Sequence, residues 1–237
     1  MKLIRMIAIQ VIASLIFAGC ETKESSSIPT QPETIQTVDT TWNNSNAYQS
    51  FTDSRDGQSY KFIKIGMQTW MAQNLNYVVE NSWCPAGTAA NCSTYGRLYQ
   101  WSSAMSLSKS YNSSLWSGVT PRTGICPSGW HVPSNTEWKR LRSFVDSATG
   151  GLRLKSKIFW SDNGNGTDQF GFRALPAGIN SEPSVFSYFG QGAYFWSSTE
   201  LNANEVWMLM LYSPRDDANI SLINHKESGA SIRCILD

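Results

Sequence analysis

The stretch Cys126-Pro-Ser-Gly-Trp-His-Val-Pro-Ser-Asn-Thr-Glu-Trp-Lys-Arg-Leu141 organises the rest of the chain, because it joins a cysteine, a turn and the clearest helix start in the sequence. Ser134 and Glu137 have the spacing of a capping box, in which each side chain accepts a hydrogen bond from the backbone amide of the other residue. Apolar residues then fall on one face of the expected helix: Trp138, Leu141 and Val145. The stretch therefore predicts a capped helix that packs on a core.

The composition limits the class of protein. Of the 237 residues, 41% are hydrophobic and 12% are aromatic, which is enough for a sizeable core. Only 16% are charged, and the formal net charge is +1. This balance gives no electrostatic basis for binding nucleic acid or an anionic membrane surface, so we exclude nucleic acid as a partner.

Residues 1–19 have the pattern of an export signal. Lys2 and Arg5 make the start positive, and residues 6–18 form an apolar run that is too short to span a bilayer as a helix. The segment is therefore predicted to direct export and is not expected to belong to the fold.

The end of this run, Phe17-Ala18-Gly19-Cys20, resembles the cleavage box of bacterial lipoproteins, in which a cysteine after small residues is lipidated. Phe17 stands where that pattern usually has Leu, and the alternative is an ordinary secretory signal with a chance cysteine. The resemblance implies acyl chains on Cys20, and each buried methylene adds about 0.8 kcal/mol of membrane affinity. Glu21 then favours the outer membrane or the cell surface as the place of anchoring.

Composition divides the remainder into a tether and one domain. Residues 20–50 are rich in Ser, Thr, Gln, Asn and Pro with scarcely any large apolar residue, so burial cannot offset the entropy of ordering them. We predict a disordered tether over residues 20–50 and a single globular domain over residues 51–237.

The domain is predicted to be α+β, with few helices, small antiparallel sheets and long ordered loops. Residues 60–65 and 68–75 are extended candidates that lie close enough to pair as a hairpin. Residues 95–105 are predicted as a short strand that runs into a helical turn. The helix after Ser134 is expected to end at Gly150-Gly151.

The second half is expected to hold a long loop followed by a meander. Residues 160–178 are dense in Gly, Asn and Asp, as long ordered loops are. Extended runs follow at residues 193–199, 206–212 and 232–236, with a weaker run at 220–224. An antiparallel meander is the economical interpretation.

Four cysteines remain after Cys20, and four cysteines allow three pairings. Disulfides are favoured over metal binding because the chain is predicted to be exported. Cys84 with Cys92 would close a short loop, while Cys126 with Cys234 would tie the turn before the helix to the last strand. In the chain-entropy model the long closure is worth on the order of 4 to 5 kcal/mol and the short one roughly half of that. We predict both disulfides and expect the fold to depend most on the long one.

Seven sequence blocks occur in an order that is typical of one family. They are Thr52-Asp53-x-Arg55-Asp56-Gly57-Gln58-x-Tyr60, Gly66-x-Gln68-x-Trp70-Met71-Ala72-Gln73-Asn74-Leu75, Tyr95-Gly96-x-Leu98-Tyr99-x-Trp101, Cys126-Pro127-x-Gly129-Trp130-His131-Val132-Pro133, Gly171-Phe172-x-Ala174-Leu175-Pro176-Ala177-Gly178, Trp196-Ser197-Ser198-Thr199-Glu200 and Ser231-Ile232-Arg233-Cys234. Together they closely resemble the Fibrobacter succinogenes major paralogous domain family over essentially all of residues 51–237. The resemblance implies a cell-surface or secreted domain, often carried on a lipoprotein.

A fainter likeness extends to the formylglycine-generating enzyme superfamily and the C-type lectin fold, through Val132-Pro133-Ser134-x-x-Glu137-Trp138 and the terminal Arg233-Cys234. It implies a C-type-lectin-like domain stapled by disulfides. We carry over no catalytic residue, because formylglycine-generating oxidation needs a reactive cysteine pair and every cysteine here has a structural partner or a lipid.

The two histidines do not indicate a catalytic centre. His131 and His225 have no acidic or nucleophilic partner close by in the sequence. A packed or hydrogen-bonding histidine is therefore favoured over a zinc site or a Ser/His/Asp triad.

The loop Asp162-Asn163-Gly164-Asn165-Gly166-Thr167-Asp168 is the candidate metal site. Alternating oxygen side chains on a glycine-rich loop suit a hard cation such as calcium, with Asp162, Asn163, Asn165 and Asp168 as ligands. The spacing lacks the bidentate Glu of an EF-hand, and the alternative is that these residues simply form tight turns.

Aromatic residues gather at residues 188–196, where a polar loop returns into a strand. Tyr188, Tyr194 and Trp196 are the candidate ligand-binding residues, because exposed rings can stack on sugars, and core packing is the alternative. The sequence thus favours a binding or structural module, for polysaccharide or for a surface protein. The alternative is an enzyme of unknown chemistry related to the formylglycine-generating superfamily.

Overall fold

The computed structural model describes residues 47–118, 121–182, 185–223 and 225–237. The predicted export signal, Cys20 and the predicted tether up to residue 46 lie outside these ranges. Strand β1 begins at Gln49, so the last residues of the predicted tether belong to the domain instead. Composition could not indicate this, because Gln49 is polar and joins the sheet by pairing with Phe62 of the next strand.

The first sheet has the strand order β1-β2-β3-β13-β6. Its strands are β1 Gln49–Thr52, β2 Ser59–Ile65, β3 Gln68–Met71, β13 Ile235–Leu236 and β6 Trp130–His131. The predicted hairpin is confirmed as β2 and β3, which turn at Gly66, where φ is +60°. Glycine adopts that conformation at little cost, and a side chain would strain it.

The second sheet has the order β11-β10-β9-β12-β5-β4, and the β7-β8 hairpin joins it through β12. Its strands are β11 Asn219–Ile223, β10 Val206–Tyr212, β9 Gly192–Glu200, β12 Gly229–Ser231, β5 Leu98–Gln100, β4 Ser82–Trp83, β7 Ile179–Glu182 and β8 Val185–Ser187. The predicted antiparallel meander is confirmed as β9, β10 and β11.

The predicted strand at residues 232–236 is wrong in part. Its first residues connect the two sheets, and only Ile235–Leu236 forms a strand, β13, which pairs with β3 and β6. The apolar run resembled a strand because Ile232 and Cys234 are fully buried. They are buried in the core between the sheets, so a segment that crosses from one sheet to the other shows the same apolar pattern as a buried strand.

The helices in the described part of the chain are short, and the capping box at Ser134 and Glu137 is confirmed. Their bounds are α1 Ala89–Tyr95, α2 Trp101–Ala104, α3 Asn135–Val145 and α4 Gly150–Leu154, with 3-10 turns η1 Pro85–Gly87 and η2 Lys109–Asn112. β5 followed by α2 confirms the predicted strand that runs into a helical turn.

The prediction that Gly150-Gly151 ends the main helix is wrong. Helix α3 ends at Val145, where Asp146 takes a positive φ of 73°, and the glycine pair begins α4. Close packing explains the glycines, since a Cβ on Gly151 would lie 2.3 Å from the carbonyl oxygen of Asp217.

Tryptophans connect α3 to both sheets. Trp138 stacks on Trp70 of β3 with ring centroids 4.6 Å apart, and its indole N–H donates to the carbonyl of Trp196 in β9 at 3.2 Å. The indole of Trp196 in turn donates to the carbonyl of Tyr99 in β5 at 2.7 Å. All four rings are fully buried, so the helix and the two sheets share one core.

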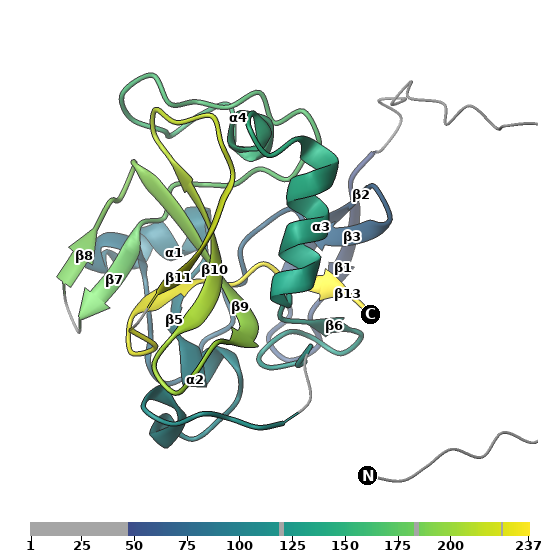
Figure 1. The fold of residues 1–237 in the computed structure, drawn as a ribbon. Coiled ribbons are helices and arrows are strands. Elements are labelled where there is room, and N and C mark those ends of the chain that lie inside the picture. The colour runs from purple at the N-terminus through teal and green to yellow at the C-terminus, as the bar shows by residue number, and fades with distance from the viewer. Residues whose placement is uncertain (1–46, 119–120, 183–184, 224) are drawn as a thin grey trace, which may run out of the picture. The chain divides into compact units, whose positions relative to one another are not determined.

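Both predicted disulfides are confirmed. Cys84 pairs with Cys92 at a sequence separation of 8, and Cys126 pairs with Cys234 at a separation of 108. Figure 1 shows α3 running down toward β6 and β13, the two strands next to the long disulfide. The described residues thus form an α+β domain that is mostly sheet, with few helices and two disulfides.

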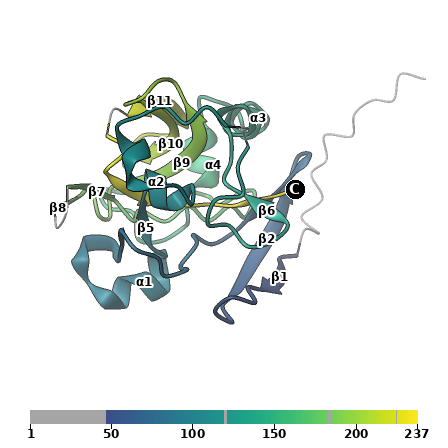
Figure 2. The same ribbon diagram turned by 90° about the horizontal axis from the view of Figure 1, so that it is seen from below.

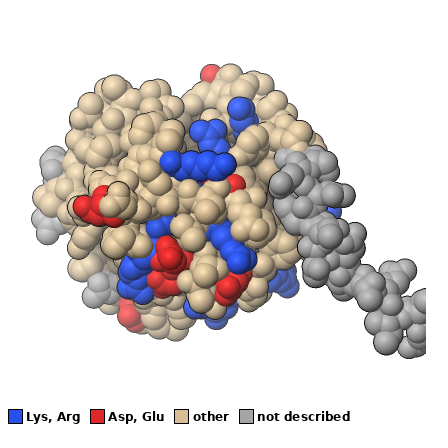
Figure 3. Space-filling model, turned by 90° about the horizontal axis from the view of Figure 1, so that it is seen from above, with Lys and Arg blue, Asp and Glu red and all other residues tan. Residues whose placement is uncertain are grey.

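The surface of the domain carries both signs of charge. Figure 3 shows acidic and basic side chains interspersed over one face, in keeping with the formal net charge of +1. Among the described residues, no helix combines the length and the hydropathy needed to cross a membrane.

Candidate functional site

Two of the three predicted ligand-binding aromatics are buried, so that prediction is wrong for Tyr194 and Trp196. Their exposed fractions are 4% and 0%. The reason is that both side chains of β9 pack into the main core, where Met208 and Met210 of β10 also lie. Tyr188 is 55% exposed, so it alone of the three can contact a ligand.

The predicted calcium loop has its oxygens engaged in turns. The Oδ1 of Asn165 accepts from the backbone amide of Trp160 at 3.0 Å, and the Oδ1 of Asp168 accepts from the amide of Arg173 at 2.7 Å. Asp162 and Asn163 are exposed and take positive φ values of 54° and 57°, as turn residues do. These contacts favour the turn interpretation, and calcium binding stays an untested prediction.

His131 has the acidic partners that its sequence neighbourhood did not indicate. Its Nδ1 lies 2.6 Å from Oδ1 of Asp237, and its Nε2 lies 2.8 Å from Oε1 of Glu137. Burial alone lowers the pKa of His131, but the two carboxylates outweigh it and raise that pKa. The pairing of β6 with β13 brings Asp237 close, so the predicted disulfide to Cys234 was the available signal.

A polar cleft of about 300 Å³ lies between the β2-β3 hairpin and α1. Its walls come from residues 58–60, 72–74 and 76 on one side and from residues 92–94 and 96 on the other, with Arg173 and Leu175 completing it. Figure 2 shows β2 and α1 on the same side of the domain. We take this polar cleft as the candidate functional site.

Side-chain amides dominate the polar cleft. Gln58 and Asn76 bind each other: Asn76 Nδ2 donates to Gln58 Oε1 at 3.1 Å, and Gln58 Nε2 donates to the carbonyl of Asn76 at 3.3 Å. The Oδ1 of Asn76 is buried and has no hydrogen-bond partner among the described residues, which is uncommon in native proteins. Of the described residues that line the cleft, none is acidic and only Arg173 is basic.

An aromatic cluster adjoins the polar cleft and consists of Tyr95, Phe159 and Phe189. The ring centroid of Tyr95, the last residue of α1, lies 5.7 Å from that of Phe159 and 4.9 Å from that of Phe189. Phe159 is 49% exposed and Phe189 is 38% exposed. Leu175 belongs to the same buried group as Tyr95 and also lines the cleft, so the two features adjoin through these residues.

Arg233 joins the walls of the polar cleft from beneath. Its guanidinium is fully buried and donates to Oδ1 of Asn74 at 2.5 Å from Nη2 and to the carbonyl of Met71 at 3.2 Å from Nη1. It also donates to the carbonyls of Phe172 and Arg173. Burial lowers the pKa of Arg233 to about 9. One buried side chain therefore fixes Asn74 on one wall and Arg173 on the other.

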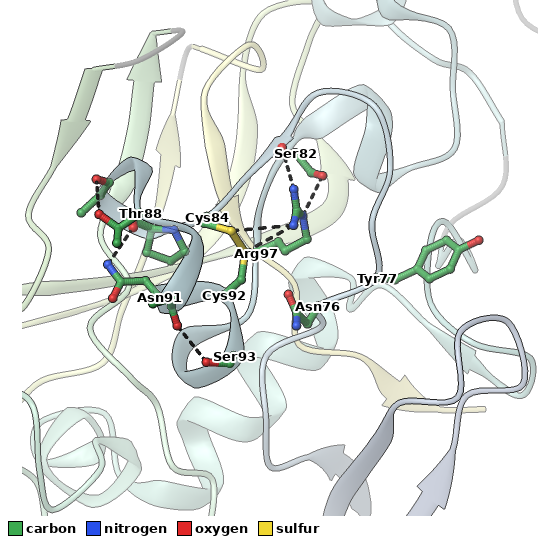
Figure 4. The surroundings of a disulfide bond; sticks show 12 residues. Asn76, Tyr77, Ser82, Cys84, Thr88, Asn91, Cys92, Ser93 and Arg97 are labelled. Carbon is green, nitrogen blue, oxygen red and sulfur yellow. Dashed lines mark hydrogen bonds between the residues drawn. A yellow bond between two sulfur atoms is a disulfide. The ribbon is translucent and has the colours of Figure 1, made fainter.

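The short disulfide stands in the opposite wall, because Cys92 lines the polar cleft. Figure 4 shows the guanidinium of Arg97 pointing at this disulfide and at Ser82. Arg97 Nη1 lies 3.3 Å from the sulfur of Cys92, and its Nε donates to the Ser82 hydroxyl at 3.0 Å. These contacts hold α1 in place beside β4.

The sequence did not indicate the polar cleft, although it contained a signal for it. Gln58 stands in the first of the seven sequence blocks, and Gln73 and Asn74 stand in the second. Polar residues within such blocks are candidates for binding a ligand when the helix or strand periodicity of the core residues does not account for them. They form a site only when β2 pairs with β3 and α1 packs opposite them, which sequence spacing does not specify.

One comparison with known proteins gives a match. Residues 63–236 match the model of the Fibrobacter succinogenes major domain. No curated protein and no solved structure matches the chain. The matched range includes α1, Arg173 and the aromatic cluster, and it begins after the first cleft residues, 58–60.

Proposed function

The chain belongs to the Fibrobacter succinogenes major domain family, and we propose that its domain is a binding module whose ligand is a carbohydrate. The observation that carries this proposal is that the aromatic cluster adjoins the polar cleft through Tyr95 and Leu175. Sugars present hydroxyl groups at their edges and C–H groups on their faces. Amide side chains match the first, and half-exposed rings match the second.

The amides of the polar cleft are arranged to exchange hydrogen bonds with hydroxyl groups. Each carboxamide carries two donors and one acceptor, so a hydroxyl can bind it in either direction. Gln73 is exposed, and the half-buried Gln58 and Asn76 hold each other in one orientation. Such pre-oriented groups lose little freedom when a ligand binds, which favours affinity.

The aromatic cluster supplies the flat surface that a sugar face needs. Phe159 and Phe189 both pack against Tyr95, so their rings are positioned before any ligand arrives. Exposed Tyr188 precedes Phe189 in the chain and packs against Tyr194, with ring centroids 6.0 Å apart. The predicted role of Tyr188 is therefore retained, with Phe159 and Phe189 in place of Tyr194 and Trp196.

Binding is favoured over catalysis by the state of the groups that would do chemistry. Cys84, Cys92, Cys126 and Cys234 are all paired in disulfides. Both ring nitrogens of His131 are within hydrogen-bond distance of carboxylates, so neither is oriented toward a substrate. The alternative, an enzyme related to the formylglycine-generating superfamily, has no such group in the cleft to support it.

The test is a polysaccharide and glycan binding screen with the purified full chain, kept in mild detergent, with and without calcium. Phe159→Ala and Phe189→Ala should each weaken binding of any hit by about five- to tenfold, because each removes one stacking ring. Phe144→Ala is the matched control. Phe144 is 44% exposed and lies beside Gly66, at the far end of the β2-β3 hairpin from the cleft. A screen without hits, or equal losses in all three variants, would contradict the proposal.

We further propose that the domain is C-type-lectin-like. Support comes from the Val132-Pro133-Ser134-x-x-Glu137-Trp138 block, which forms the capped start of α3, and from the long disulfide at Cys234. A lectin-like fold carries a late meander and a terminal strand that returns to the start of the domain. β13 makes this return beside β3.

The last part of the proposal is the predicted lipid anchor on Cys20. We propose that the chain is exported and held in the bacterial envelope, in the outer membrane or at the cell surface, by acyl chains on Cys20. Cys20→Ser should move the protein from the membrane fraction to the soluble fraction, because a chain with a formal net charge of +1 has little attraction for lipid headgroups. Detergent-phase partitioning measures this, with Cys84→Ser as the control that leaves partitioning unchanged. A Cys20→Ser protein that stays in the detergent phase would contradict lipidation.

A further inference from the structure

We infer that the polar cleft binds a sugar acid, that is, a polysaccharide whose units carry free carboxylates, and that Arg173 recognises the carboxylate. This inference rests on the proposed function and specifies its ligand class. It begins from the charge of the cleft. Arg173 is the one charged residue among the described residues that line it. A single cation within a lining of neutral amides selects for one anionic group on an otherwise uncharged, hydroxylated ligand.

The guanidinium of Arg173 is available. It forms no hydrogen bond and no ion pair with any residue in the described part of the chain, whereas Arg55, Arg97, Arg215 and Arg233 all bind partners through theirs. Asp168 accepts a hydrogen bond from the backbone amide of Arg173 and not from its side chain. Arg173 is half-buried and lines the polar cleft, so its charge is near the cleft and only partly hydrated.

The backbone holds Arg173 in an unusual conformation. Its φ is +51°, a region that residues other than glycine rarely adopt. Contacts on both sides enforce this conformation: Asp168 accepts from its amide, and Arg233 donates to its carbonyl. Strained backbone that the surroundings enforce is concentrated at binding sites. Here the enforced backbone conformation fixes the point at the edge of the cleft from which the Arg173 side chain extends.

The chemistry of the guanidinium favours a carboxylate over other anions of comparable charge. Its planar pair of N–H donors matches the two oxygens of a carboxylate, and the resulting pair of charge-assisted hydrogen bonds is directional. Uronic acids carry a carboxylate on a ring carbon of the sugar, and the other ring carbons bear hydroxyls. A ring stacked on the aromatic cluster would present its hydroxyls to the amides and its carboxylate to Arg173.

The decisive experiment compares two forms of one polymer. Homogalacturonan oligomers with free carboxylates and the same oligomers fully methyl-esterified differ only at the carboxyl group, which is charged in the first and a neutral methyl ester in the second. We expect the full chain in mild detergent to bind the free acid at least about tenfold more tightly by isothermal titration calorimetry. Arg173→Gln should abolish this difference, and Arg173→Lys should keep part of it, because Lys retains the charge and loses the paired donors.

A matched control removes one positive charge elsewhere. Arg140 is exposed on α3 and does not line the polar cleft, so Arg140→Gln should leave the preference for the free acid unchanged. Thermal melting of each variant by circular dichroism verifies that the domain is folded. The preference should also weaken with rising salt, as an ion pair at a partly exposed site does.

The outcomes separate this inference from the proposed function. A preference for the free acid that Arg173→Gln removes and Arg140→Gln keeps supports both. Equal binding of the two forms, or binding of neutral polysaccharides alone in the screen, overturns the sugar-acid inference and leaves the carbohydrate module standing. Failure to bind any polysaccharide overturns both. A preference that survives in Arg173→Gln overturns the role assigned to Arg173.

Discussion

The two disulfides lie in two regions of the domain to which we assign different roles, stability and ligand binding. The first, here called the anchor side, surrounds Cys126 and Cys234 and includes the capped helix α3, β6 and β13. The second, the cleft side, surrounds Cys84 and Cys92 and includes α1, the polar cleft and the aromatic cluster. The anchor side is closed by a disulfide with a sequence separation of 108, and the cleft side by one with a separation of 8.

The difference shows where stability and binding are located in this fold. On the anchor side, Cys126 and Cys234 are almost fully buried, and polar groups such as His131 and Glu137 are turned toward each other. On the cleft side, Gln73 is exposed and the half-buried Arg173 has no side-chain hydrogen bond or ion pair with any described residue. A long closure restricts the unfolded chain most, while a short one mainly fixes a local surface. We therefore expect stability to depend on the first region and ligand binding on the second.

The largest expected effect comes from opening the anchor side. Cys234→Ala should lower the free energy of unfolding by about 2 to 5 kcal/mol, the usual range for losing a native disulfide in an exported domain. Urea unfolding with a constant m-value measures the loss. Cys126→Ala opens the same loop and should give a similar loss. Non-reducing peptide mapping that joined Cys126 to Cys84 or Cys92 would contradict the pairing itself.

The second largest effect is expected from opening the short disulfide on the cleft side, which should reduce ligand binding more than stability. Cys92→Ala should cost roughly half as much stability as Cys234→Ala, because the loop that it opens is short. It should also lower affinity for any polysaccharide ligand, since Cys92 lines the polar cleft and fixes α1.

Cys84→Ala separates two causes of that loss of affinity. It opens the same loop, but Cys84 does not line the cleft. Equal affinity losses in Cys84→Ala and Cys92→Ala would place the cause in the position of α1. If Cys234→Ala, measured where it is fully folded, lost as much affinity as Cys92→Ala, stability and ligand binding would not be located in separate regions.

The anchor side was predictable from the sequence to a much greater extent than the cleft side. The capping box and the buried face of α3 follow from local spacing, and the disulfide pairing is one of the three that four cysteines allow. The partners of His131 do not, because Asp237 reaches it across the pairing of β6 with β13. Sequence spacing alone does not specify which strand lies beside which.

On the cleft side, burial was the property that the sequence could not provide. Tyr194 and Phe189 are similar residues five positions apart, yet the first is enclosed by sheet and the second is 38% exposed. The difference depends on whether other elements pack on the face from which the side chain projects, which is set by contacts distant in sequence. Arg173 carried no local signal at all. Its importance depends on Asp168 and Arg233, and the latter is 60 residues away.

A smaller effect is expected from pH, and only on the anchor side. The folded-state pKa of His131 is raised above 6.5, so its contribution to stability is fully present below pH 6.5 and is lost as pH rises through the folded pKa. The pKa of Glu137 is lowered below 4.5, so its contribution is present above pH 4.5 and is lost as pH falls through the folded pKa. The anchor side should therefore be most stable at pH values between the folded-state pKa of Glu137 and that of His131.

His131→Gln tests the alkaline loss. The variant does not titrate, so its urea midpoint should fall less than that of the wild type between about pH 6 and about pH 9. His225→Gln is the control, because His225 is exposed and is the only other histidine. Polysaccharide affinity in His131→Gln should match the wild type. Identical pH profiles for the wild type and His131→Gln would remove the His131 network from the account of stability.

The smallest expected effect is that of a chelator on the cleft side. A cation bound only to the native state would stabilise the domain by about 2.7 kcal/mol at a hundred times its Kd, and its removal would lower the melting temperature. We expect excess chelator to leave the melting curve unchanged, because the Oδ1 atoms of Asn165 and Asp168 already accept from backbone amides. Asp168→Ala should instead destabilise the domain equally with and without chelator, since it removes the acceptor that holds the amide of Arg173. A melting temperature that falls with chelator and returns with added calcium would restore Asp162, Asn163, Asn165 and Asp168 as a metal site, and would make the cleft side dependent on a cation as well as on its disulfide.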